Sequence, residues 1–524
     1  MCACLILTAV TASAQVDVLT VNYDNSRTNS NLSEYTLSPA NVNPGQFGRL
    51  ATLQVDGQVY AQPLVVTGVN VPGHGQSDLV IVATMRNFVY AFDANATGSP
   101  APLWTVWLGP PVPSSDYNSD FQYTDITPEI GILSTPVIDR QTGTLYVVNA
   151  NRVGKSHSHT LHALDLASGR IITGPMQIRG SVFGIGETNV GGVITFDSFQ
   201  HLQRPGLLLS DGVVYAAFGS HADQGIFFGW IMGYDAADIT RQVSVFNTTP
   251  DAYGGSIWMS GHGMAAGSNG AIYAITGNGD ADGRRDFGES FIKLDGRNSL
   301  ALLDWFTPSN WQQLDDFDRD LGSTSPILIP GTDLLIGGGK EGVLYVLKQS
   351  NLGHYTEGNS NIVTSVQAVE SGIFDLAVFP RQEDTLIYIH GWGESVKIFR
   401  LAGERLEELP RSQSVLEGNI PFGGMTVTAA GNLPGSAIFW LTSTDGGQAG
   451  TLWPGTLHAY VAEDLSVELW NSDLDAADRL PSFTKFVSPT VANGRVFVPT
   501  LSGQVAVYGL KSTDQAEQAS RPIH

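Results

Sequence analysis

The hexapeptide LHALDL, residues 161–166, decides the fold, because variants of it return along the whole chain. Each variant is a short, mostly apolar run with Asp, or a substitute for Asp, at the fifth position. The variants recur at intervals of 48 to 72 residues. Repetition at such a period predicts one repeat architecture and not a string of unrelated domains. The fifth positions of the eight copies are Asp93, Asp165, Asp235, Asp295, Lys348, Arg400, Val461 and Gly509.

Further strand patterns accompany these copies. A strand often opened by proline comes first, as at Pro136 and Pro326, and a second apolar run follows it. A run containing tryptophan closes several units, as at Trp104, Trp305 and Trp470, and 59 glycines supply tight turns. Four short strands repeated eight times, with no long amphipathic helix, predict an all-β fold: an eight-bladed β-propeller of four-stranded antiparallel blades.

The ends of the chain differ from this repeat. Residues 3–10 are apolar and ASA ends at Ala14, which is typical of a signal peptide over residues 1–15, although a buried first strand is the alternative. The propeller then covers residues 16–510, with the strand that closes its ring expected within residues 49–66. Residues 511–524 are polar and predict a disordered tail.

Charge and cysteine content limit the partners. Lys and Arg total 27 against 50 Asp and Glu, a net charge of −23, which repels nucleic acid and anionic lipid. The two cysteines, Cys2 and Cys4, lie in the signal segment, so the mature chain is expected to have no disulfide or thiolate metal site. The apolar run is too short to cross a membrane. We expect a secreted or periplasmic monomer that inserts into no membrane.

A dense run of carboxylates is the first candidate site. QLDDFDRDLGSTSP, residues 313–326, carries Asp315, Asp316, Asp318 and Asp320. Like charges this close need a metal, a cationic partner or open water. Three interpretations remain open: part of a catalytic site, a structural cation site, or a solvated loop between blades whose Asp side chains cap turns.

A second candidate is a calcium loop. NGDADGRRDFGE, residues 278–289, has oxygen ligands at the spacing of an EF-hand loop and Gly283 at the sharp turn, without flanking helices. The alternative is a polar Asp/Gly hairpin that binds nothing. The predicted ligands are Asn278, Asp280, Asp282, Asp286 and Glu289.

Histidines are weaker candidates. His157 and His159 fall on one face of a strand, as two metal ligands would, or in a solvated loop. His221, His262 and His390 lie near glycine-rich strand ends and would line the propeller axis or serve as hydrogen-bonded packing residues.

Several phrases resemble a known family. Residues 22–50 (NYDNSRTNSNLSEYTLSPANVNPGQFGRL), 128–139 (PEIGILSTPVID) and 486–500 (FVSPTVANGRVFVPT) resemble secreted bacterial proteins with pyrroloquinoline quinone (PQQ)-like repeats, which are related to quinoprotein alcohol dehydrogenases. The resemblance covers nearly the whole chain at repeat level. It implies an eight-bladed propeller and, in the dehydrogenases, PQQ and Ca²⁺ at its axis.

The resemblance also implies roles for single residues. Trp258 in GGSIWMSGHG is similar to the tryptophan that stacks on the quinone, and Asn278 in ITGNGD resembles an asparagine ligand of Ca²⁺. DDFDRD resembles the phrase that holds the catalytic base, which would be Asp315. Lys340 in KEGVLYVLKQ is similar to a residue that contacts the quinone.

The chain also departs from that family. Where the dehydrogenases have a glutamate ligand, this chain offers Gln224 or Asp223, and Phe228 stands where an arginine is expected. The adjacent cysteines beneath the quinone are absent. Two functions therefore stay open: a Ca²⁺-stabilised scaffold that binds a protein, glycan or small molecule, or a PQQ- and Ca²⁺-dependent dehydrogenase oxidising an alcohol or sugar.

Overall fold

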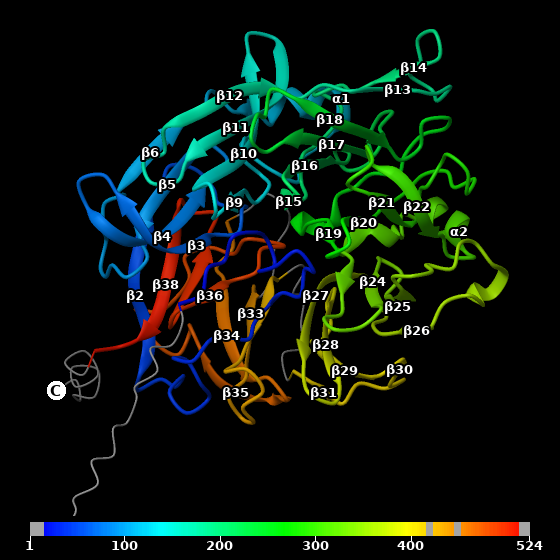
Figure 1. Ribbon diagram of the computed structural model, residues 1–524. Coiled ribbons are helices and arrows are strands. Elements are labelled where there is room, and N and C mark those ends of the chain that lie inside the picture. Colours follow the sequence, from blue (N-terminus) through cyan, green and yellow to red (C-terminus); the bar gives the residue numbers. More distant parts are fainter. Residues whose placement is uncertain (1–14, 415–422, 445–451, 513–524) are drawn as a thin grey trace, which may run out of the picture.

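Eight small sheets stand around a central axis (Figure 1), so the predicted all-β, eight-bladed propeller is confirmed. The computed structural model describes residues 15–414, 423–444 and 452–512. The predicted signal peptide, apart from Gln15, and the predicted tail, apart from residues 511–512, lie outside these ranges. Among the described residues, no helix is both long and apolar enough to cross a membrane.

Each blade has four antiparallel strands, numbered here from the axis outward. Blade 1 is β3 (Leu64–Val71), β4 (Gly75–Ala83), β5 (Phe88–Asp93) and β6 (Trp104–Trp107). Blade 2 is β9 (Val137–Asp139), β10 (Thr144–Val153), β11 (Ser156–Asp165) and β12 (Ile171–Gln177). Blade 3 is β15 (Leu208–Ser210), β16 (Val213–Phe218), β17 (Trp230–Asp235) and β18 (Gln242–Asn247). Blade 4 is β19 (Ala265–Ala266), β20 (Ala271–Ile275), β21 (Phe291–Asp295) and β22 (Ala301–Phe306).

The second half repeats the plan. Blade 5 is β23 (Ile327–Leu328), β24 (Leu334–Gly338), β25 (Val343–Lys348) and β26 (Thr364–Gln367). Blade 6 is β27 (Ile373–Pro380), β28 (Thr385–Gly391), β29 (Lys397–Ala402) and β30 (Arg405–Leu406), with β31 (Ser412–Gln413) also on β29. Blade 7 is β32 (Met425–Thr428), β33 (Ile438–Ser443), β34 (Thr456–Val461) and β35 (Asp464–Asn471). Blade 8 is β36 (Thr490–Ala492), β37 (Arg495–Pro499), β38 (Gln504–Leu510) and β2 (Phe47–Gln54).

Strand β2 closes the ring, as the position of residues 49–66 predicts. It pairs antiparallel with β38, from Phe47 opposite Leu510 to Gln54 opposite Gln504. The Phe47 ring packs 4.9 Å from the Trp470 ring, so the closing strand is also tied to blade 7. The first and last parts of the propeller thus share one sheet, which closes the ring.

The repeated hexapeptide is the third strand of every blade. Its aspartate has a local role at the turn into the outer strand: Asp93, Asp235 and Asp295 each accept a hydrogen bond of 2.9 to 3.0 Å from the backbone N–H two residues on. Such a side-chain turn explains why aspartate recurs there.

The N-terminal segment forms a belt, defined here as residues 18–31, inside the ring (Figure 1). It includes β1 (Ser30–Asn31), which lies parallel to β32. The belt forms hydrogen bonds with the innermost strand of every blade or with the residue beside it, so it closes the axis at one end. The partners, one in each blade in order, are Val65, Ile138, Leu209, Ala266, Leu328, Val378, Val427 and Val491.

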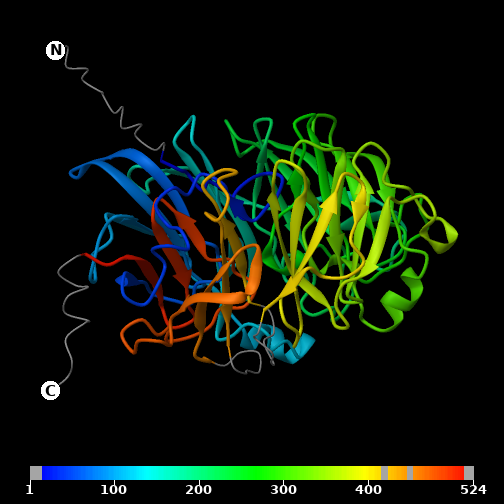
Figure 2. The same ribbon diagram turned by 90° about the horizontal axis from the view of Figure 1, so that it is seen from below.

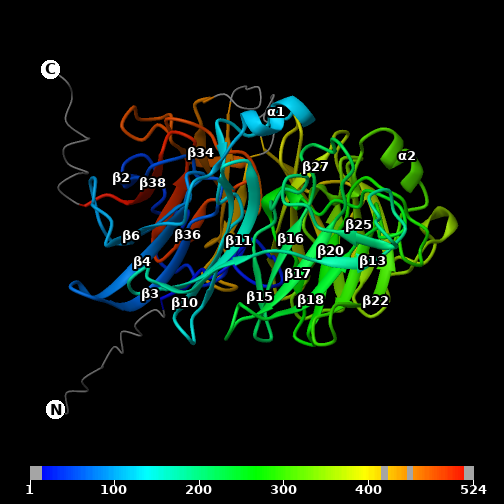
Figure 3. The same ribbon diagram turned by 90° about the horizontal axis from the view of Figure 1, so that it is seen from above.

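Short elements lie in the connections between and within blades. The helices α1 (Ser115–Phe121) and α2 (Trp311–Asp316) lie on the same face of the disc (Figures 2 and 3). The other elements are β7 (Val112–Pro113), β8 (Glu129–Ile130), β13 (Ser181–Phe183), β14 (Val193–Thr195) and the 3₁₀ turns η1 (Met259–Gly261), η2 (Leu321–Ser323) and η3 (Glu357–Asn359).

Candidate functional site

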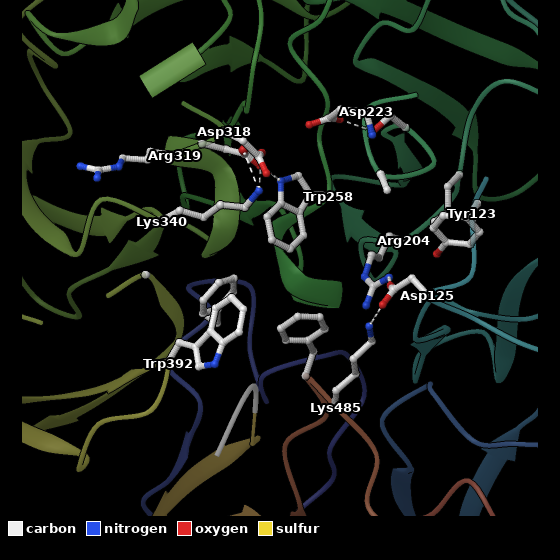
Figure 4. A pocket seen from close by; sticks show the side chains of 17 residues that line it. Tyr123, Asp125, Arg204, Asp223, Trp258, Asp318, Arg319, Lys340, Trp392 and Lys485 are labelled. Carbon is white, nitrogen blue, oxygen red and sulfur yellow. Dashed lines mark hydrogen bonds and ion pairs between the residues drawn. The ribbon is translucent and has the colours of Figure 1, made fainter. Parts of the chain in front are cut away.

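A cavity of about 440 Å³ opens at the axis on one face of the disc. Two kinds of loop meet there: connections from one blade to the next, and loops between the second and third strands of a blade. Antiparallel four-stranded blades put both kinds at the same end, which is how residues from Tyr123 to Phe486 come together (Figure 4). The belt lies beneath: Val21 and Asn22 share a void of about 10 Å³ with Phe486.

One wall of the cavity is acidic. Carboxylate oxygens of Asp223, Asp318 and Asp320, from blade 3 and from the connection into blade 5, all lie within 4.8 Å of one another. Asn278 Nδ2, from blade 4, donates to Asp223 Oδ2 and to Asp318 Oδ1, and each of these hydrogen bonds is 3.0 Å long. The Asn278 side chain is buried and its Oδ1 has no hydrogen-bond partner among the described residues.

Lys340 is the cation of this wall. Its Nζ lies 2.7 Å from Asp318 Oδ1 and 3.0 Å from Asp320 Oδ1. The backbone N–H of Lys340 also donates to Asp320 O over 2.8 Å, which locks the two loops together. Burial opposes the charge on Lys340, but Asp320 and Asp318 outweigh it and raise the pKa of the ammonium group.

The carboxylates differ in their protonation. Burial raises the pKa of Asp320 to about 7 against the attraction of Lys340, and burial also raises the pKa of Asp223. For Asp318, the hydrogen bond with Asp320 and the charge of Lys340 overcome the effect of burial and lower the pKa. Asp318 is therefore the carboxylate that is ionised most readily. Its backbone φ of +53° is left-handed, a strain typical of functional positions.

Aromatic rings form the floor. Trp258 is half-buried, and its indole Nε1 donates to Asp320 Oδ2 over 2.8 Å. The centroid of its ring lies 6.4 Å from that of Phe374 and 6.2 Å from that of Phe486, and Trp392 lies 6.4 Å from Phe374. Phe486 has φ +63°, an unfavourable conformation for a bulky residue, so its backbone is strained where its ring enters the cavity.

The opposite wall is basic (Figure 4). Asp125, from the connection after α1, forms ion pairs with Lys485 and, at 3.5 Å, with Arg204. The Arg204 guanidinium lies 5.0 Å from the centre of the Phe486 ring and Lys485 Nζ lies 5.4 Å from it. The three charged groups belong to three separate connections between blades.

The predicted calcium loop does not gather its ligands at one point. Asp282 Oδ1 accepts hydrogen bonds from the backbone N–H groups of residues 284, 285 and 286, as a turn cap does. Asn278 faces the acidic wall, whereas Glu289 is fully buried behind Asp320 and accepts from Leu321 N over 2.6 Å. Burial and the charge of Asp320 raise the pKa of Glu289 well above its usual value.

The other two predicted ligands of the loop are Asp286 and Asp280. Asp286 Oδ1 accepts a hydrogen bond of 3.0 Å from Asp251 N. Asp280 lies outside the one carboxylate cluster found among the described residues, and calcium binding by this loop stays a prediction.

The remaining candidates fall outside the cavity lining. Asp315 and Asp316 are the last residues of α2 and are therefore helical, not extended. Asp315 accepts a hydrogen bond from the backbone of Gly279. Gln224 is exposed, while its neighbour Asp223 joins the acidic wall. The stretch 313–326 is not wholly solvated, because Asp320 is 1% exposed. The role of Asp315 as base stays a prediction.

Sequence patterns predicted Trp258 but no other residue of the floor, and none of the basic wall. Asp125, Arg204 and Lys485 are isolated charges in connections that do not repeat. The available signal was the setting of Lys485 in SFTKFVSP, a cation between two aromatic residues. Phe374 is part of β27 and reads as an ordinary core residue.

Comparison with known proteins supports the fold. No protein-family model matches the chain, and no curated protein matches it. Among solved structures, the quinohemoprotein alcohol dehydrogenase from Comamonas testosteroni aligns over 95% of this chain and 81% of its own, with a TM-score of 0.60 and 15% identity. A computationally designed protein, Ika8, aligns over 88% and 99%, with a TM-score of 0.48 and 10% identity. The chain thus shares its eight-bladed propeller fold with a quinohemoprotein alcohol dehydrogenase.

Proposed function

We propose that the protein is an exported, secreted or periplasmic, dehydrogenase that binds Ca²⁺ and PQQ in the axial cavity and oxidises an alcohol or sugar. One observation carries the proposal: Asp223 and Asp318 line one cavity together with Lys340 and Trp258, and Asn278 bridges the two carboxylates, although these residues are far apart in the sequence.

The acidic wall fits a calcium ion. Three carboxylates and one ammonium group, when all are ionised, leave a net charge of −2 that a divalent cation neutralises. Ca²⁺ takes six to eight oxygen ligands and tolerates irregular geometry. The amide of Asn278 sits between two of the carboxylates, and turning it by 180° would direct its buried Oδ1 to the same point. The wall then offers oxygen ligands from four side chains.

The rest of the cavity fits a planar quinone. Its volume lies within the range of small-molecule sites, about 300–1,000 Å³, and Trp258 supplies a flat surface in its lining. Lys340 Nζ can donate to an oxygen of such a ligand from beside that ring, at 5.6 Å from its centre. When bound, PQQ supplies the acceptor for the two electrons and two protons that leave an alcohol as it becomes a carbonyl compound.

The protein's own part is to position groups and accept a proton. Asp318 is the proton acceptor in this proposal, because it lines the cavity, is the most readily ionised carboxylate and is fixed by Lys340 and Asn278. Asp320 is a positioning residue, since one of its oxygens accepts from Trp258 and the other lies beside Lys340.

Reconstitution tests the proposal. Purified protein is incubated with Ca²⁺ and PQQ, and bound quinone is followed by absorbance while a redox dye reports turnover on a panel of alcohols and sugars. We expect stoichiometric quinone and substrate-dependent dye reduction, both abolished by chelator. Absence of bound PQQ at millimolar Ca²⁺ would contradict it.

A scaffold function is the second candidate, favoured by one surface. The hairpin β13–β14 exposes Phe183 by 80%, Ile185 by 72% and Val190 by 83%, next to a cavity of about 680 Å³. Exposed apolar clusters commonly bind partners. Photo-crosslinking in the producing cells from position 190, with Gln141 as the control position, tests this. A specific product at 190 alone would support a scaffold.

A further inference from the structure

The basic wall of the axial cavity holds more positive than negative charge. Arg204 and Lys485 face a single carboxylate, Asp125, and all three line the cavity. We propose that Arg204 and Lys485 bind the carboxylate of a small organic acid, so that the substrate of the cavity is a hydroxy acid or sugar acid. The inference rests on the proposed function for turnover, but its test requires neither quinone nor calcium.

Burial makes this excess charge costly. The side chains of Arg204 and Lys485 are 7% and 13% exposed, and that of Asp125 is 30% exposed. Arg204 Nε is buried and has no hydrogen-bond partner among the described residues. A buried cation without a full counter-charge is destabilising, so a second anion is favoured here. Consistent with this, burial together with the charge of Arg204 lowers the pKa of Lys485, against the attraction of Asp125.

The two walls carry opposite charge. The acidic wall with Asp318 and the basic wall with Lys485 lie on different sides of the aromatic floor (Figure 4). A molecule with a carboxylate at one end and a hydroxyl at the other matches this arrangement: its acid group meets Arg204 while its hydroxyl points to Asp318. Oxidation of that hydroxyl to a carbonyl loses the same two electrons and two protons as for any alcohol.

The charge balance favours a monoanion. Two cations and Asp125 leave a net charge of +1, which one carboxylate neutralises, whereas a dianion would leave a buried negative charge. A guanidinium fork also matches the planar carboxylate geometrically. The backbone strain at Phe486, whose ring lies under both cations, is consistent with a position selected for binding.

The carboxylate bound by Arg204 and Lys485 could also belong to the cofactor, because PQQ itself carries carboxylates. We assign the subsite to the substrate, because the groups proposed for the quinone lie toward the acidic wall: Lys340 belongs to that wall, and Trp258 of the floor is hydrogen-bonded to its Asp320. A competition experiment distinguishes the two: the affinity of the protein for acetate should be unchanged after it has been preloaded with PQQ and Ca²⁺. Loss of acid binding on preloading would overturn the assignment to the substrate.

Calorimetric titration with acetate and with glycolate tests the subsite. The buffer contains a chelator and no quinone. We expect Arg204→Met and Lys485→Met each to weaken binding at least tenfold, and Asp125→Asn to tighten it, because that change frees both cations. Arg140→Met, at an exposed ion pair outside the cavity lining, is the control and should change nothing.

The titrations can fail or succeed independently of the dehydrogenase proposal. Acetate binding without any quinone binding would support the subsite and reject the dehydrogenase. Acetate that binds no more tightly than chloride, or an Asp125→Asn variant that binds it more weakly, would overturn the subsite. If Arg204→Met does not fold, the opposite responses of Lys485→Met and Asp125→Asn decide alone.

Discussion

The indole N–H of Trp258 donates to Asp320 Oδ2 over 2.8 Å, and this bond joins the loop entering blade 4 to the loop entering blade 5. The other oxygen of Asp320 lies 3.0 Å from Lys340 Nζ. Tryptophan, aspartate and lysine therefore behave as one unit, in which the carboxylate sets the position of both neighbours.

Replacing Trp258 by phenylalanine tests that unit. The change leaves Asp320 Oδ2 buried without its donor, which should cost about 1–3 kcal/mol of unfolding free energy. Urea unfolding of Trp258→Phe, Asp320→Asn and the double variant gives the coupling energy. We expect clear non-additivity, and additive effects would show that the two residues act independently.

Two aspartates of the acidic stretch, Asp318 and Asp315, should differ in what their replacement does to activity. Asp318→Asn should keep the propeller fold and, at saturating Ca²⁺, still bind PQQ, but it should lose PQQ-dependent dye reduction at least a hundredfold, because an amide cannot accept the hydroxyl proton. Asp315→Asn, outside the cavity lining, should keep most activity, with the exposed Asp316→Asn as the matched control. The reverse order would restore Asp315 as the base.

Two calcium sites can be told apart by thermal unfolding. If the axial wall holds the ion, chelator should lower the melting temperature of the wild type but not of Asp223→Asn. The loop variants Asp280→Ala and Asp282→Ala should keep their sensitivity to chelator, although Asp282→Ala loses a turn cap and about 1–2 kcal/mol in any buffer. Sensitivity lost only in the loop variants would place the ion in residues 278–289.

Stability should fall in mild acid because of buried histidines. Burial lowers the pKa of His390 to about 4, its Nδ1 lies 3.3 Å from Gly423 O, and its Nε2 has no partner among the described residues. Between pH 6.5 and 4 the unfolded chain binds a proton that the folded chain does not, so each such group contributes a slope of up to about 1.4 kcal/mol per pH unit. His390→Gln should flatten the pH dependence of urea unfolding in that window. An unchanged slope would contradict a lowered pKa of His390 in the folded protein.

The belt should be essential for stability. Arg27 is fully buried and donates to Met264 O over 2.7 Å, Val21 O over 2.8 Å and Thr20 Oγ1 over 2.9 Å. Arg27→Met removes these donors while keeping much of the volume, so we expect a loss of about 3 kcal/mol or more in chemical unfolding. Arg140→Met, at the surface, should cost less than about 1 kcal/mol.

The propeller followed from the sequence because each blade repeats one local pattern. The Asp of the third strand caps a turn within its own hexapeptide, so its signal is complete in a few residues, as at Asp93 and Asp235. These turns lie at the face opposite the cavity. The repeat therefore predicts the scaffold well and says nothing about the residues at the other end of the strands.

The sequence predicted only part of the candidate site. Charge density led to Asp318 and Asp320, and resemblance led to Trp258, Asn278 and Lys340. Linear spacing does not show that the chain turns inward before β21 and buries the Glu289 carboxyl behind Asp320. The basic wall depends on the juxtaposition of three connections, since Asp125 and Arg204 are separated by 79 residues and Arg204 and Lys485 by 281, and no local pattern records it.

The belt has a consequence for how the chain acquires its structure. Asn31 Nδ2 donates to Val491 O across a sequence separation of 460 residues, and belt contacts also reach each of the other seven blades. Contacts at such separation form late and slowly. A segment that is synthesised first therefore finds its last partner only when the final blade exists. The axial cavity, whose floor rests on that segment, matures only after the whole ring has assembled, so a partly made chain has no site to fill.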